Sequence, residues 1–175
     1  MKRYAPLLLI LCLAFFSASG TPKEREHRTV TKVVDGMTLE LDGGETLRLI
    51  GVATPQPDPG NPAKQKWADR ATEFTRKLVE GRKVSLEYGK EKTDDQGRTW
   101  AFVRFIIPLE ELSGIVDQSF MPFWGTGGEF MLNRMLIEYG YATTHSPFSF
   151  KYRTTFSGLE KNARVKQIGM WQDFH

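Results

Sequence analysis

The chain has 175 residues, 40% of them hydrophobic and 26% charged, which is enough for one folded domain and excludes wholesale disorder. Its formal net charge is +3, but Lys2 and Arg3 lie in an N-terminal stretch without acids. Taking these two from the 24 Lys and Arg residues leaves 22 against 21 Asp and Glu, a net charge of +1. Total charge therefore gives no sign of a polyanion-binding protein.

Residues 1–20 predict an export signal. Two basic residues precede the apolar run Leu7–Phe16, and small residues follow, as a signal peptidase requires. The run is shorter than the ~18–20 apolar residues that span a bilayer. We therefore expect a secreted or periplasmic protein with no transmembrane span in its mature form. The alternative is a protein that an uncut N-terminal segment anchors to the membrane. Cys12, the only cysteine, would leave with the signal, so the mature chain would have no disulfide.

A polar leader at residues 21–28 is followed by β-type patterns. Short strands are expected around Val30–Val34, Leu39–Leu41 and Leu47–Leu49, with turn signals at Asp35-Gly36 and Asp42-Gly43-Gly44 between them. Prolines in residues 54–60 then exclude helix from that loop. The pattern predicts a meander of three strands followed by a loop.

Helical periodicity begins after this loop. One apolar stripe predicts a helix that Gly81 ends, formed by Ala63, Trp67, Ala71, Phe74 and Leu78. Two more strands are expected at 84–88 and 100–107, with a turn at 94–98 between them. Further helices are expected over 131–139, ended by Gly140, and from about 155 towards 168–171. Residues 108–128 interrupt the succession of strand and helix patterns and are interpreted as an insertion.

These elements predict an α+β fold that is mainly β. Five short strands with one helix after the third and two at the end suit a small barrel packed by helices.

Three motifs resemble those of the staphylococcal nuclease (thermonuclease-like) family. They are VVDGMTL at 33–39, RLIGVATPQ at 48–56 and DDQGR at 94–98. Residues 132–142 and 160–171 also resemble that family, in the same order and spacing. The resemblance implies an OB-type five-stranded barrel with three packed helices. The expected domain is 29–172, with the insertion at about 108–128.

The resemblance also implies a chemistry, which is Ca²⁺-assisted hydrolysis of phosphodiester bonds. Two carboxylates hold the ion, because Ca²⁺ is a hard cation that prefers oxygen ligands. A glutamate activates or orients the attacking water, and two arginines bind the phosphate and offset charge that develops on it.

The acidic positions of these motifs carry other residues in this chain. Met37 and Ala53 stand at the two metal-ligand positions, and neither side chain is a ligand for Ca²⁺. Gln56 stands at the base position, where its amide can hydrogen-bond water but cannot accept a proton. We therefore expect a degenerate active site without a metal or other cofactor. Ca²⁺ would bind only if nuclease activity survives.

The cationic positions are retained at Arg48 and Arg98, and Thr54 is retained beside them. Two interpretations of the arginines stay open. In the first, the two arginines are unpaired, leave positive potential at one shallow site and bind an anion. In the second, they are structural remnants that are solvated or paired with a carboxylate. Asp35 is expected to cap its own turn, and Asp58 to be solvated in its loop. The three histidines are scattered, which supports neither a zinc site nor a histidine nuclease.

The sequence thus predicts an exported, monomeric binding module that is catalytically inactive. Its ligand would be nucleic acid, another phosphate-containing molecule or a protein, the last through Phe123 and Trp124 of the insertion. The alternative is a nuclease acting on DNA or RNA with an altered metal requirement. A third reading, a structural subunit of the cell envelope, applies only if the N-terminal segment stays as an anchor.

Overall fold

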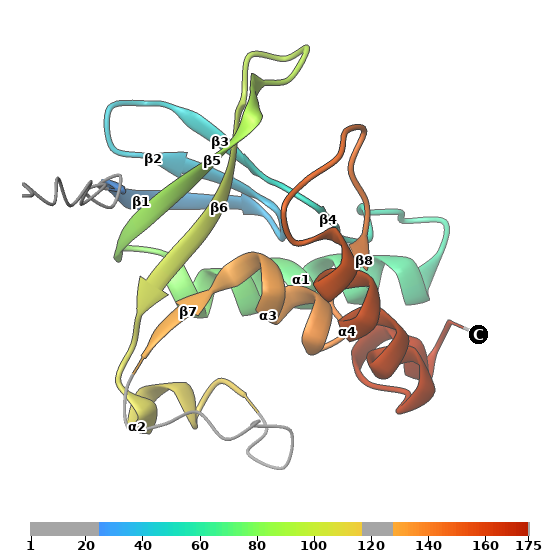
Figure 1. Cartoon of the computed structure of the whole chain (residues 1–175). Coiled ribbons are helices and arrows are strands. Elements are labelled where there is room, and N and C mark those ends of the chain that lie inside the picture. Colours follow the sequence, from blue (N-terminus) through green and yellow to red (C-terminus); the bar gives the residue numbers. More distant parts are fainter. Residues whose placement is uncertain (1–24, 117–127, 175) are drawn as a thin grey trace, which may run out of the picture.

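The computed structural model describes residues 25–116 and 128–174 (Figure 1). The expected export signal and the insertion aromatics Phe123 and Trp124 lie outside these residues. No helix in the described ranges is long and apolar enough to cross a membrane.

All five expected strands are present. They are β1 (Glu26–Asp35), β2 (Thr38–Leu41), β3 (Thr46–Leu49), β5 (Lys83–Thr93) and β6 (Thr99–Ile106). The prediction of a loose leader through residue 28 is wrong for its last residues. Glu26 to Thr29 pair with β5, opposite Leu86 to Lys83, so the strand begins inside the expected leader.

The five strands close into a barrel. The sheet order is β3-β2-β1-β5-β6-β7, and β3 also pairs with β6 in parallel, with Leu47 opposite Thr99 and Leu49 opposite Ala101. That contact joins the first and fifth strands of the order and closes the ring. The sequence did not predict β7 (Glu129–Met131) or the ribbon of β4 (Val52–Ala53) and β8 (Thr143–Thr144), which are too short to show alternation.

The three expected helices are α1 (Pro62–Val79), α3 (Leu132–Glu138) and α4 (Arg153–Val165), and a short α2 (Leu109–Leu112) lies in the insertion. The last helix does not run on to 171. It ends at Val165, and a separate 3₁₀ turn, η2, covers Gly169–Gln172. Two positive φ angles, 53° at Gln167 and 62° at Gly169, break the helical path between them.

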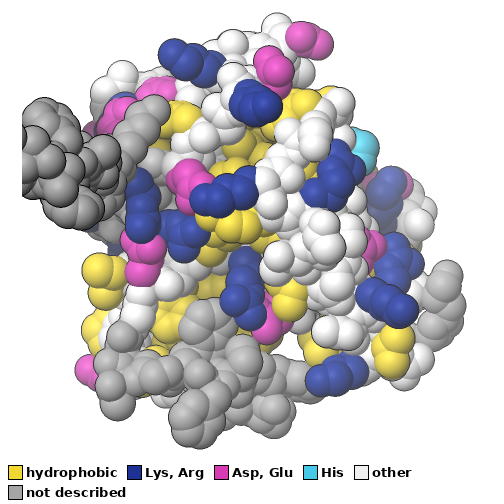
Figure 2. Space-filling view, viewed as in Figure 1, with side chains coloured by type: hydrophobic (Ala, Val, Ile, Leu, Met, Phe, Trp, Pro, Cys, Tyr) yellow, Lys and Arg dark blue, Asp and Glu magenta, His cyan; other side chains and the backbone are white. Residues whose placement is uncertain are grey.

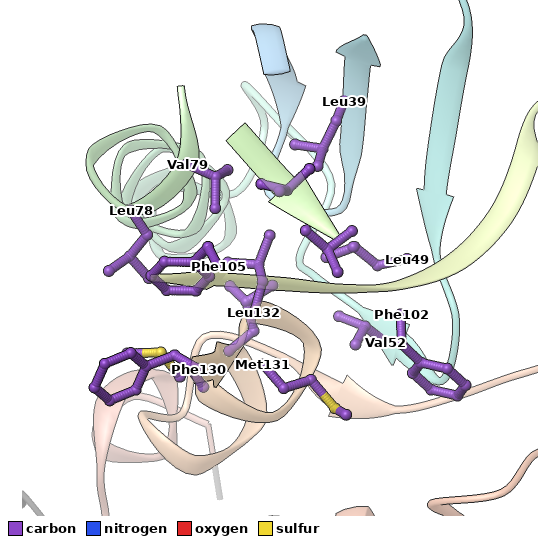
Figure 3. Close-up of a cluster of buried hydrophobic side chains, with 14 of the residues drawn as sticks. Leu39, Leu49, Val52, Leu78, Val79, Phe102, Phe105, Phe130, Met131 and Leu132 are labelled. Atoms are coloured by element: carbon purple, nitrogen blue, oxygen red, sulfur yellow. The ribbon is translucent and has the colours of Figure 1, made fainter. Parts of the chain in front are cut away.

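The barrel and the helices share one interior. Figure 3 shows side chains of the strands, such as Leu39, Leu49 and Phe105, packed with Leu78 of α1 and Leu132 of α3. Four aromatic residues of the helices and of the segments next to them are buried, namely Trp67, Phe74, Phe130 and Trp171. Phe130 lies on β7 rather than on a helix. Trp67, Ala163, Met170 and Trp171 form a smaller cluster where the C-terminal segment meets α1.

One buried polar side chain connects α3 to the barrel. Asn133 is 0% exposed, and its Oδ1 accepts a hydrogen bond from the Val103 N–H at 2.9 Å. Its Nδ2 donates to the Ile50 carbonyl at 2.9 Å and to the Ala101 carbonyl at 3.3 Å. The side chain therefore bonds the backbone of β6 and of the residue that follows β3, at the place where these two strands meet.

Candidate functional site

The turn between β1 and β2 is packed tightly against α1. Asp35 Oδ1 accepts the Met37 N–H at 2.8 Å, so Asp35 caps its own turn as expected. The Gly36 carbonyl accepts the Thr75 hydroxyl at 2.9 Å. A Cβ on Gly36 would lie 2.8 Å from Thr54 Cγ2 and 2.9 Å from Ala71 Cβ, so only glycine fits there. The first two motifs are thus in direct contact.

The side chain of Met37 reinforces this contact. Met37 is only 2% exposed, and its Sδ lies 3.5 Å from the Thr54 N–H, which donates to it. Its carbonyl accepts the Leu49 N–H at 2.9 Å. The thioether therefore occupies the space between the two motifs and belongs to the core, where it cannot serve as a ligand for a hard cation.

Neither Ala53, at the end of β4, nor Gln56, in the loop after it, supplies an acid. Gln56 Nε2 donates to the Thr54 carbonyl at 3.2 Å, so the amide bonds to its own loop. Ala53 pairs with Thr143 across the β4–β8 ribbon. Thr54 is 6% exposed, and its Oγ1 makes no hydrogen bond within residues 25–116 and 128–174.

Arg48 points from β3 towards the turn. Its Nη1 donates to Thr38 Oγ1 at 3.0 Å and lies 4.0 Å from Asp35 Oδ2. Burial lowers the pKa of Arg48, Asp35 opposes that effect, and the charge of Arg98 adds to it. Arg98 precedes Trp100, the β6 partner of Arg48, by two residues, so the two arginines lie on the same pair of segments.

Arg98 is paired within its own turn. Its Nε donates to Asp94 Oδ2 at 2.6 Å, while Asp94 Oδ1 accepts the backbone N–H groups of Arg98 and Gln96, both at 2.9 Å. Burial alone would raise the pKa of Asp94, but these hydrogen bonds outweigh it and hold the pKa below its usual value. Arg98 is therefore not unpaired, because the turn that positions it does so through a carboxylate. Anion binding by the two arginines stays a prediction.

An aromatic pair lies beside the arginines. Trp100 stands opposite Arg48 in the β3–β6 pairing, and its ring meets that of Phe148 edge-on, with centroids 5.4 Å apart. Both rings are partly buried. Sequence reasoning missed Asp94, Trp100 and Phe148 as site residues. The position of Trp100, two residues after Arg98, was the available signal.

The residues of this site do not fit a Ca²⁺ ion. Within residues 25–116 and 128–174, no three His, Cys, Asp or Glu side chains lie together in a way that could hold a metal. Asp35 and Asp94 are committed to their own turns and arginines. Asp58 lies in the following loop, where its Oδ1 accepts the Gly60 N–H and its Oδ2 lies 3.4 Å from Lys64 Nζ.

We expect millimolar Ca²⁺ to leave the melting temperature of the protein unchanged. A ligand that binds only the folded state stabilises it by RT ln(1 + [L]/Kd), and a site without free carboxylates gives no such gain. Thermal denaturation with CaCl₂, and with NaCl at matched ionic strength, measures this. A rise specific to Ca²⁺ would show that Asp35 or another acid has been recruited.

A five-stranded barrel packed by three helices, with two arginines at adjacent strand and turn positions, defines the staphylococcal nuclease class of fold. Residues 46–173 match the family model described as staphylococcal nuclease homologue. The chain is 30% identical to a thermonuclease of Staphylococcus intermedius, an alignment that covers 98% of this chain and 99% of that protein. It is 26% identical to a thermonuclease of Staphylococcus hyicus, covering 95% and 92%. The chain belongs to the staphylococcal nuclease family.

Proposed function

We propose that this protein is an exported family member that binds a phosphate-containing ligand, nucleic acid in the first place, without hydrolysing it. The observation that carries the proposal is the contact between Met37 and Thr54. A buried thioether joins the two segments that would need carboxylates to hold an ion between them. The side chain at the base position, Gln56, donates to the carbonyl of Thr54, two residues before it.

The expected loss of activity is large. Removal of a general base costs roughly 10²–10⁴-fold in rate. Loss of the metal removes a Lewis acid that stabilises charge in the same step, so the two losses compound.

Binding is supported by the donors that the arginines keep. In the described part of the chain, hydrogen bonds engage only Nη1 of the Arg48 guanidinium and Nε of the Arg98 guanidinium. Each guanidinium has five N–H donors, so both have donors left for phosphate oxygens. The Trp100–Phe148 pair offers ring faces or edges on which a base could pack.

The distribution of charge over the surface favours a small phosphate-binding site at the two arginines rather than an extended basic surface. In the view of Figure 2, Lys and Arg side chains are interspersed with Asp and Glu and do not merge into one basic patch. We therefore expect weak binding that depends on few phosphate contacts, with a shallow dependence on salt.

Replacement of Arg98 or Arg48 by Met is expected to weaken binding of a fluorescein-labelled single-stranded oligonucleotide by about tenfold or more, because each removes a charged hydrogen-bond donor. Fluorescence anisotropy at low salt measures the affinity. The matched control is Arg76→Met, an exposed arginine of α1 that pairs with Glu73. If Arg76→Met weakens binding as much, or if the wild type does not bind at all, the site has been assigned wrongly.

The alternative function, phosphodiester hydrolysis with an altered metal requirement, is favoured by the relatives, both of which are named thermonucleases. A nuclease assay on the purified protein with Ca²⁺, Mg²⁺, Mn²⁺ or EDTA separates the two. Cleavage that is lost in Arg48→Met would establish the alternative.

We also propose that residues 1–20 are removed during export. Intact-mass spectrometry of the protein from the medium or periplasm should give a mass that begins at Thr21, since small residues at 17–20 suit cleavage there. A mass that includes Met1 would support the membrane-anchored alternative.

A further inference from the structure

A cavity of about 350 Å³ lies beside the segment that follows β4. Ala53 and Pro55 line one side of it, and Met170, Trp171 and Phe174 of the C-terminal segment also line it. Figure 1 shows why these residues meet: α4 and the C-terminal turn lie next to β8 and the beginning of α1. The volume is that of a site for a small organic molecule, and the lining is mostly apolar and aromatic.

The charged side chains that line this cavity are both cationic. They are Lys64, in the first turn of α1, and Arg164 of α4; no Asp or Glu is among the lining residues. Lys64 pairs with Asp58 at 3.4 Å and Arg164 pairs with Glu160 at 2.8 Å. The Lys64–Asp58 pair is exposed on both sides and therefore weak, so an anion in the cavity could compete for Lys64. Glu160 is only 15% exposed and accepts from both Nε and Nη2 of Arg164, which leaves Nη1 as the Arg164 nitrogen for an anion.

Two buried polar groups in the cavity lining have no partner. Thr54 Oγ1 and Trp171 Nε1 make no hydrogen bond with any described residue, although each residue is only 6% exposed. An indole N–H and a hydroxyl both donate, and a buried donor without an acceptor is unfavourable. An oxygen-rich ligand could supply that acceptor after a small movement of the lining.

The aromatic and cationic side chains that line the cavity favour a planar ligand. The guanidinium of Arg164 lies over the ring of Trp171, 3.7 Å from its centroid. Phe174 and the adaptable thioether of Met170 complete an apolar surface beside them. An aromatic body could pack on this surface while its charged group reaches the cations.

We propose that this cavity binds a small organic anion with an aromatic body, such as an aromatic carboxylate or phosphate. Neither Arg48 nor Arg98 lines it, although Ala53 and Thr54 of the candidate site form one side of it.

The test is titration of the full mature protein with naphthoate and with naphthyl phosphate, followed through the indole N–H resonance of Trp171 after triple-resonance assignment. We expect a saturable shift with a dissociation constant of about 1 mM for a probe of this size. Comparison of the two probes distinguishes a carboxylate preference from a phosphate preference. Neutral naphthalenemethanol should bind at least about tenfold more weakly, because it lacks the charge that the two cations recognise.

Two variants locate the binding. Arg164→Met and Lys64→Met should each weaken the anionic probes about fivefold, since each removes one cation. Arg153→Met, an exposed arginine of α4 outside the cavity, and Arg98→Met should both leave the affinity unchanged. Melting temperatures confirm that each variant folds. The proposal is overturned if Trp171 does not respond, if the neutral probe binds equally well, or if Arg153→Met or Arg98→Met has the effect expected of Arg164→Met.

Discussion

The triple variant Met37→Asp, Ala53→Asp, Gln56→Glu is expected to gain Ca²⁺-dependent hydrolysis of DNA or RNA, whereas the wild-type protein shows negligible activity. The substitutions restore two oxygen ligands and a base next to Arg48 and Arg98, which are still in place. Recovery should be partial, because catalytic groups must be held within ~0.5 Å of their working positions. The loop after Gln56, with prolines at 57 and 59, is the main source of misplacement.

The burial of Met37 makes this experiment more informative. Met37→Asp alone should lower the melting temperature, since it places a carboxylate at a position only 2% exposed, beside Asp35, and removes the acceptor of the Thr54 N–H. In the triple variant, Ca²⁺ should restore part of that loss. Stability and activity would then respond to the same ion.

Two controls secure the result. Arg48→Ala or Arg98→Ala in the restored background should abolish whatever activity returns, which also rules out a contaminating nuclease. Robust cleavage by the wild-type protein that disappears in Arg48→Ala would overturn the proposal of an inactive protein. A triple variant that gains Ca²⁺-dependent stability but no activity would show that the arginines are held too far away.

Asn133→Leu is expected to lower the free energy of unfolding by about 3 kcal/mol or more. It leaves the Val103 N–H and the Ile50 carbonyl without the partners that Asn133 provides, in a fully buried position, and each such group costs about 1–3 kcal/mol. For a domain of this size that corresponds to a fall of about 10 °C in melting temperature. Thermal and urea denaturation measure it.

The matched control is Asn162→Leu, on the exposed face of α4, where the change should stay within about 0.5 kcal/mol. An Asn133→Leu protein as stable as the control would mean that the three hydrogen bonds contribute nothing net. The resemblance placed Asn133 in a family motif, but only the structure shows which backbone groups it satisfies.

The arginine site shows where reasoning from sequence reached its limit. The motifs identified Arg48 and Arg98 as the retained cationic positions, and the replacement of three acids could be read directly from the sequence. The sequence could not show that Arg48 lies near Asp35 and that Arg98 pairs with Asp94. These contacts depend on how two turns fold back on their own side chains. The same holds for Trp100, which faces Arg48 only because β3 and β6 meet in parallel to close the ring.

The sequence by itself determined the family, the class of fold, the five barrel strands and the helices, because each of these has a periodicity or a motif of its own. It also determined that no carboxylate stands at positions 37, 53 and 56. The tertiary structure decided the rest: the short strands β4, β7 and β8, the break after Val165, the burial of Met37 and the cavity beside Trp171. These features arise from contacts between segments far apart in the chain, and such contacts leave no periodic signal in either segment.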